Sequence, residues 1–115
     1  MKRNATAIMP VRIKIPLEEV QKLAFIFKAD KSDYAPVLAR REFVTKESIP
    51  IKEDLGNEGF VVKLRLEAEE TAKFPADKVY MDTMMLLADG IVPETNIVCI
   101  ENIKETLFGQ EMCDD

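Results

Sequence analysis

The side chains that could perform acid–base chemistry in this sequence are carboxylates, because the chain contains no histidine. General acid–base catalysis needs titratable groups within hydrogen-bond reach of one reacting atom. Glu69 and Glu70 are neighbours, but adjacent residues in a turn point apart. Asp82 and Asp89 lie at opposite ends of half a predicted strand, ~20 Å apart at the rise of a strand. Neither pair suits a shared site, so we expect solvent-facing charge and turn formation, and no catalytic residue.

The two thiols, Cys99 and Cys113, are also poor candidates for chemistry. Without histidine, neither can be a thiolate–imidazole nucleophile. Two cysteines do not make a disulfide framework, which favours synthesis and folding in a reducing cytoplasm. Cys99 lies in an apolar run, where we expect a small buried hydrophobe. Cys113 lies in the acidic tail.

Metal and cofactor motifs are missing from the sequence. Asp30, Ser32 and Asp33 come closest to an oxygen-rich cation loop, but an Asx-type turn explains them more simply. The four glycines are scattered and form no phosphate-binding loop. We therefore expect no metal and no cofactor.

Composition is that of one ordinary globular domain. The chain has 115 residues, 47% of them apolar, and a net charge of −5 from 21 acidic and 16 basic residues. This sign disfavours binding to nucleic acid or to an anionic membrane surface. Arg40 and Arg41 form a basic pair, which we interpret as a solvated strand face. We expect a single domain over 1–115, with a core at about 8–108, a loose N-terminus at 1–7 and an acidic tail at 109–115. No apolar run is long enough for a signal peptide or a membrane span.

The clearest element is a strand over Phe60–Leu66, in which apolar side chains alternate with Val61, Lys63 and Arg65. The following residues, Glu67 to Lys73, indicate one short helical turn that crosses between two sheets, with Phe74 plugging the core.

Other runs also predict strands. Residues 20–29 fit a helical period as well, but the aromatic and β-branched residues at the centre favour a strand. Pro10 and Pro16 bracket the first run, as is typical of strand ends or an edge. With turn signals about every 8–12 residues, the pattern predicts an antiparallel β-sandwich of about seven strands. The further runs are Val11–Ile15, Val20–Ala29, Val37–Val44, Ile49–Ile51, Lys78–Ala88 and Asn96–Ile103, with Leu107 and Phe108 closing the sandwich.

The predicted strand Lys78–Ala88 is apolar on both faces at its C-terminal end. This indicates a central strand, or a face that a partner covers. Methionines in this strand are usually core filling, although adaptable Met surfaces also occur at interfaces. The candidate interface residues are Tyr80, Met84 and Leu86.

One arrangement of short motifs resembles a known group of proteins. It runs through Leu64-x-Leu66, Glu69-Glu70-Thr71-x-Lys73-Phe74, a strand, Asp89-Gly90 and Thr95-Asn96-Ile97 before a final apolar strand. It resembles small structural proteins of tailed phages and prophages of Gram-positive bacteria. These are similar to the N-terminal immunoglobulin-like domain of upper baseplate proteins. The resemblance covers roughly Val11 to Phe108 and marks no active site, and it implies that the predicted antiparallel β-sandwich is immunoglobulin-like.

This resemblance implies a non-enzymatic virion protein, a tail or baseplate component that packs against copies of itself or against other phage structural proteins. It would be made in the bacterial cytoplasm and end in the virion. The alternative is a bacterial ligand-binding β-sandwich for a carbohydrate or protein ligand. Such a module needs exposed aromatic residues, and the sequence offers only Tyr34 and Tyr80 as candidates.

Overall fold

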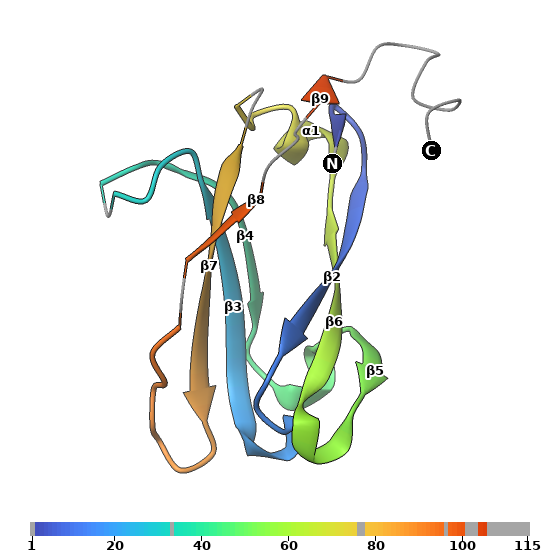
Figure 1. The fold of residues 1–115 in the computed structure, drawn as a ribbon, viewed down its shortest axis with the longest axis vertical. Coiled ribbons are helices and arrows are strands. Elements are labelled where there is room, and N and C mark those ends of the chain that lie inside the picture. The colour runs from blue at the N-terminus through green and yellow to red at the C-terminus, as the bar shows by residue number, and fades with distance from the viewer. Residues whose placement is uncertain (1, 33, 76–77, 96, 101–103, 106–115) are drawn as a thin grey trace.

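The computed structural model describes residues 2–32, 34–75, 78–95, 97–100 and 104–105. Within these residues, seven strands form two facing antiparallel sheets (Figure 1). One sheet has the order β2 (Ala7–Ile13), β6 (Phe60–Leu66), β5 (Ile51–Asp54). The other has the order β4 (Val37–Phe43), β3 (Val20–Lys28), β7 (Val79–Leu87), β8 (Val98–Ile100). The predicted immunoglobulin-like antiparallel β-sandwich is confirmed.

The strand order matches the immunoglobulin arrangement when β2 is taken as strand B. The order β2-β6-β5 then corresponds to B-E-D, and the order β4-β3-β7-β8 corresponds to C′-C-F-G of a variable-type domain. Strand β3, as strand C, pairs with both β4 and β7. Because β3 lies between β4 and β7, and the short β8 pairs with only three residues of β7, β3 is the middle one of the three long strands of this sheet.

The core lies between the two sheets and follows the alternation predicted for β6. Phe60, Val62, Leu64 and Leu66 have no exposed surface. Strand β3 faces them with one row of its own side chains, so residues 20–28 form a strand and not the alternative helix. The remaining large apolar side chains that are fully buried are Val20, Leu23, Phe25, Phe27, Phe74 and Val79.

A short helix, α1 (Ala68–Thr71), connects β6 to β7 and so carries the chain from one sheet to the other. This is the corner that the sequence predicts. Phe74 follows it, is fully buried, and stacks on Phe27 with the ring centroids 5.7 Å apart.

The N-terminal residues differ from the prediction of a loose segment. Strand β1 (Lys2–Arg3) pairs in parallel with β9 (Lys104–Glu105) beside α1 (Figure 1). The buried Thr71 hydroxyl donates to the Ala5 carbonyl at 2.8 Å and accepts from the Ala5 amide at 3.2 Å. This contact joins residues 66 positions apart, so local composition gives no sign of it.

The first strand also begins earlier than predicted, at Ala7 instead of Val11, and it ends at Ile13. Pro10 lies in its middle, opposite Lys63. A proline is tolerated there because β2 is an edge strand and its outer side needs no amide donor.

Two further strands, β4 and β7, match their predicted ranges to within one residue at each end. The strand predicted at Ile49–Ile51 is shifted, because β5 begins at Ile51 and runs to Asp54. Two 3₁₀ turns occupy predicted connections, at Leu17–Glu19 and Gly56–Glu58. The predicted last strand is described only at Val98–Ile100. Leu107, Phe108, Cys113 and the tail lie outside the described residues.

Candidate interface on the four-stranded sheet

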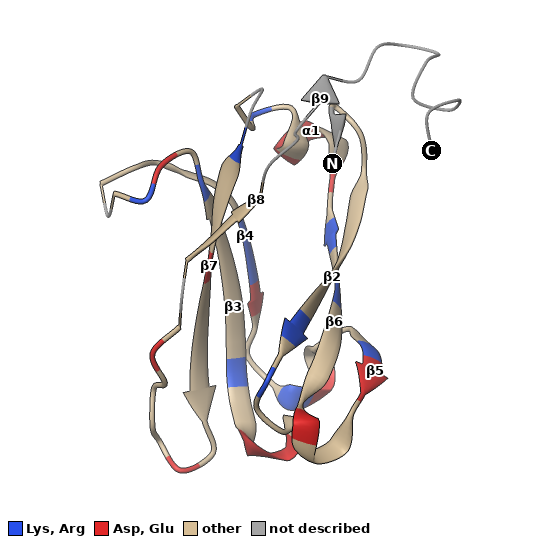
Figure 2. Ribbon diagram, in the orientation of Figure 1, with Lys and Arg blue, Asp and Glu red and all other residues tan. Residues whose placement is uncertain are grey.

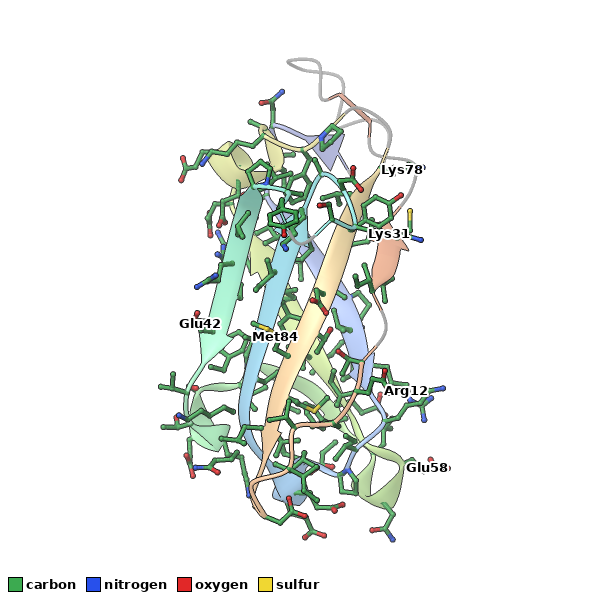
Figure 3. The ribbon with its side chains drawn as sticks, turned by 90° about the vertical axis from the view of Figure 1, so that its left-hand side faces the viewer. Arg12, Lys31, Glu42, Glu58, Lys78 and Met84 are labelled. Atoms are coloured by element: carbon green, nitrogen blue, oxygen red, sulfur yellow. The ribbon has the colours of Figure 1, made fainter. Side chains whose placement is uncertain are left out.

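The candidate residues Tyr80, Met84 and Leu86 all lie on the outward face of β7. The inward residues alternate with them, and Val79, Met81 and Met85 are buried in the core cluster. Figure 3 shows Met84 near the centre of this outer face, with its side chain pointing away from the sandwich. Met84 is 45% exposed, whereas Tyr80 and Leu86 are half-buried.

The strand register defines which residues are neighbours on this face. Ala24 of β3 lies opposite Glu42 of β4 on one side and opposite Met84 on the other. In the next row, Ile26 lies between Arg40 and Asp82. Side chains directly opposite each other on adjacent strands contact one another. The face therefore has an apolar centre with charged residues beside it.

A shallow groove of about 230 Å³ lies at the apolar end of this face. This is smaller than the 300–1,000 Å³ typical of small-molecule pockets. Its size suits a side chain of a protein partner better than a complete small ligand. Its outward-facing walls come from β3, the β4 end and β7, namely Lys22, Ala24, Glu42, Val44, Met84 and Leu86.

The structure separates Tyr80 from the other two candidate residues. Met84 and Leu86 share the groove, whereas Tyr80 lies opposite Lys28, two rows beyond Ala24. The ammonium groups of Lys31 and Lys78 lie 5.7 and 5.9 Å from the centroid of the Tyr80 ring. Such contacts are cation–π interactions, so the ring is already covered by this chain's own lysines.

Two ionic features accompany the apolar centre. Arg40 pairs with Glu42 at 3.1 Å, and both side chains are about half exposed. Asp82 is partly buried beside Ile26 and makes no ion pair within the described part of the chain. Figure 2 shows charges of both signs interspersed along the described strands.

The edge of β7 beyond β8 is closed by the segment that follows the strand. The Leu87 amide donates to the Ile91 carbonyl at 2.9 Å, and the Thr95 hydroxyl donates to the Thr83 carbonyl. Asp89 makes the predicted turn, because its carboxylate accepts from the Ile91 amide at 3.0 Å. The strand is thus covered along its edge, while its outer face remains open around Met84.

The structure corrects the expectation for Cys99. This thiol is free and exposed on β8, not buried. Strand β8 is a short edge strand that pairs only with the first three residues of β7, so nothing in the described chain covers that side of it.

The other residues singled out for chemistry do not form a site. The Asp30 carboxylate accepts from the Ser32 amide at 3.4 Å, as an Asx turn does, while Asp33 lies outside the described residues. No group of three metal-binding side chains is close enough to hold an ion within the described residues.

The sequence did not predict the ion pair between Arg41 and Glu70, whose side chains are less exposed than those of the Arg40–Glu42 and Arg65–Glu67 pairs. Arg41 faces inward on β4, beside Ala39 and Phe43, and is not part of a solvated face. Its guanidinium donates to both Glu70 carboxylate oxygens, one at 2.7 Å, and to the Arg65 carbonyl at 3.1 Å. The ion pair joins β4, an edge strand of the four-stranded sheet, to the α1 corner. The sequence signal for Arg41 was that strand alternation places it on the same side as Ala39 and Phe43, which face inward. That alternation did not identify Glu70 as its partner.

We expect this ion pair to make stability depend on acid pH. The hydrogen bond from Arg41 lowers the pKa of Glu70 below its usual value. A lowered folded-state pKa contributes stability that is complete above the ordinary carboxyl pKa and is lost as the pH falls through the lowered value. Glu70→Gln should cost about 1–3 kcal/mol of unfolding free energy at pH 7, because it leaves Arg41 without its charged partner. The difference from wild type should shrink below about pH 4.

Urea unfolding followed by circular dichroism between pH 2.5 and pH 7 checks this. Glu42→Gln removes the exposed pair with Arg40 and is the matched control, expected to cost under about 1 kcal/mol. An equal, pH-independent loss in both variants contradicts the role of Glu70.

Comparisons with known proteins add little to this geometry. No family model matches the sequence, and no curated protein matches it. A solved structure of the extracellular domain of the voltage-gated sodium channel beta4 subunit is similar at a TM-score of 0.43 and 9% identity, covering 92% of this chain and 88% of that chain. That likeness is too low to bear on partners or function. The fold and face define an immunoglobulin-like sandwich with an open apolar patch.

Within the described residues, no helix is both long and apolar enough to cross a bilayer.

Proposed function

We propose that this protein is a non-enzymatic structural module that works by protein–protein assembly. The observation that supports this most directly is the exposed Met84 side chain, which shares an open groove with Ala24 and Leu86. Methionine adapts its shape to a partner, and an apolar groove edged by charges is typical of a protein interface. Tyr80 extends the same face toward the other end of β7.

The larger assembly in this proposal is the virion of a tailed phage or prophage, with the chain as a tail or baseplate component. Support comes from the sequence resemblance around Glu69 to Phe74 and Asp89-Gly90. These residues build the corner and the turn, so they support a shared fold more than a shared partner surface. The chain would be made in the bacterial cytoplasm and then incorporated into the particle.

Ligand binding is the weaker alternative. Tyr34 is 97% exposed and could stack on a sugar ring. Tyr80 is a poor second platform, because Lys31 and Lys78 lie over its ring. The groove beside Met84 is also smaller than most small-molecule pockets.

Particle incorporation tests the proposal. We expect a tagged copy, expressed in the strain that carries the gene, to co-purify with phage particles through a density gradient. Met84→Glu should lower its amount in the particles at least about tenfold, because burying an unpaired carboxylate in an apolar contact costs several times the thermal energy. Immunoblots of gradient fractions measure the amount.

Ile8→Glu is the matched control, because Ile8 is 54% exposed on β2 in the opposite sheet. It should enter particles as wild type does. Absence of the wild-type chain from particles contradicts the virion role, and normal incorporation of Met84→Glu contradicts the role of this face.

A further inference from the structure

We infer that the partner on this outer face is a second copy of the chain, related by a two-fold axis that runs along β3. This inference rests on the proposed function, which leaves the partner open. It follows from the arrangement of charges on the face, given by the strand register.

An axis along β3 brings β4 of one copy over β7 of the other. Arg40 and Asp82 lie in the same row, on either side of Ile26. The axis therefore places Arg40 of each copy opposite Asp82 of the other, which makes two equivalent ion pairs. Asp82, which has no ion pair within the described part of its own chain, gains a cation in this way.

The apolar residues also meet under this axis. Ala24 and Ile26 lie on β3 and so face their own equivalents at the centre. Val44, which follows β4 and is 62% exposed, comes opposite Leu86 of the other copy. Lys22 and Lys28 face their equivalents at the two ends, where long side chains can turn toward solvent.

A two-fold axis across the strands, midway between the Ala24 row and the Ile26 row, is the competing arrangement that also pairs opposite charges. It would place Arg40 opposite Glu42 of the other copy, but Met84 would then cover Asp82. A carboxylate buried against a thioether without a cation is unfavourable. With the axis along β3, Met84 instead meets Glu42, which keeps its own Arg40 at 3.1 Å. The strands of the two copies therefore run in the same direction.

The size of the face predicts a weak dimer. Four rows and three strands, with their side chains, cover about 600 Å² per copy at standard strand spacings. Stable complexes usually bury about 800 Å² per partner. We expect a dissociation constant of about 10–100 µM, and a dimer whose formation depends on concentration.

Charge reversal tests the pairing. Sedimentation equilibrium from about 5 µM to 1 mM should show a monomer–dimer equilibrium for wild type. Arg40→Asp and Asp82→Arg should each weaken it at least about tenfold, and the double variant should restore it to within about threefold of wild type. Arg12→Asp makes the same charge change on β2 of the opposite sheet, where Figure 3 shows Arg12, and should have no effect.

Thiol cross-linking gives a readout that does not depend on the charge variants folding. In a Cys99→Ser, Cys113→Ser background, Ala24→Cys lies on the axis. Facing sheets are about 10 Å apart, too far for a direct disulfide, so a short bis-maleimide linker should join the two thiols in a covalent dimer. A monomer at every concentration, or the absence of a covalent dimer, overturns this inference. It is also overturned if the Arg40→Glu, Glu42→Arg double variant restores dimerisation and the predicted Arg40→Asp, Asp82→Arg double variant does not. If purified protein stays monomeric while Met84→Glu still blocks particle incorporation, the inference fails and the proposed function stands.

Discussion

Gly59→Ala is expected to destabilise the protein by about 3 kcal/mol or more, because Gly59 occupies a backbone region that is essentially restricted to glycine. Its φ is 107° and its ψ is −149°. A Cβ atom there would lie 1.9 Å from the Ile13 carbonyl oxygen and 2.9 Å from the Ile13 carbonyl carbon. Both are backbone atoms of β2, so neither can rotate away as a side chain would. The close approach occurs where Ile13 pairs with Phe60 at the end of the β2–β6 ladder.

Gly56→Ala is the matched control for this substitution. Gly56 also has a positive φ, 65°, but a Cβ atom there would meet nothing within 4 Å. Its cost should be about 1–2 kcal/mol, that of the left-handed conformation alone. Urea titrations of both variants measure the difference in the free energy of unfolding. Equal costs at the two glycines would mean that β2 does not approach Gly59 this closely.

Phe74→Ala is expected to cost about 3–5 kcal/mol, because the substitution leaves a cavity in a fully buried site. The ring of Phe74 stacks on Phe27 of β3 at an interplanar angle of 25°. Phe74 follows the α1 corner, so the same side chain joins the crossover segment to the four-stranded sheet. Thermal unfolding should show a midpoint lowered by roughly 10 °C or more.

Two variants bracket this result. Phe74→Leu keeps most of the volume and should cost less than Phe74→Ala. Tyr34→Ala removes an aromatic ring that is 97% exposed and should change stability by no more than about 0.5 kcal/mol. A loss below about 1 kcal/mol for Phe74→Ala would show that Phe74 does not fill the core.

The strands were predictable where one face of each is buried. Alternation along Phe60–Leu66 reproduces the observed burial residue by residue, since successive side chains on a strand point to opposite faces. The α1 corner and the Asp89-Gly90 turn were predictable for a similar reason, because short-range hydrogen bonds within the segment stabilise them. Asp89 binds the Ile91 amide, and Glu70 binds the Glu67 amide at 2.9 Å.

Long-range contacts were not predictable from local pattern. Arg41 and Glu70 are 29 residues apart, and Thr71 and Ala5 are 66 apart. In each of these two pairs, the sequence around one residue does not identify the other residue as its partner. The exposure of Cys99 was missed for a related reason, since the apolar run around it resembles a buried strand although β8 is a short edge strand.

The candidate face shows the same division. The sequence alone determined that the chain forms a β-sandwich and that Met84 and Leu86 share one side of their strand, because strand periodicity is local. The tertiary structure decided that β3 lies between β4 and β7, which brings Ala24 beside Met84 and places Ile26 between Arg40 and Asp82. Strand order and register depend on how distant strands bury their apolar rows together, and that is a property of the whole core, not of any one segment.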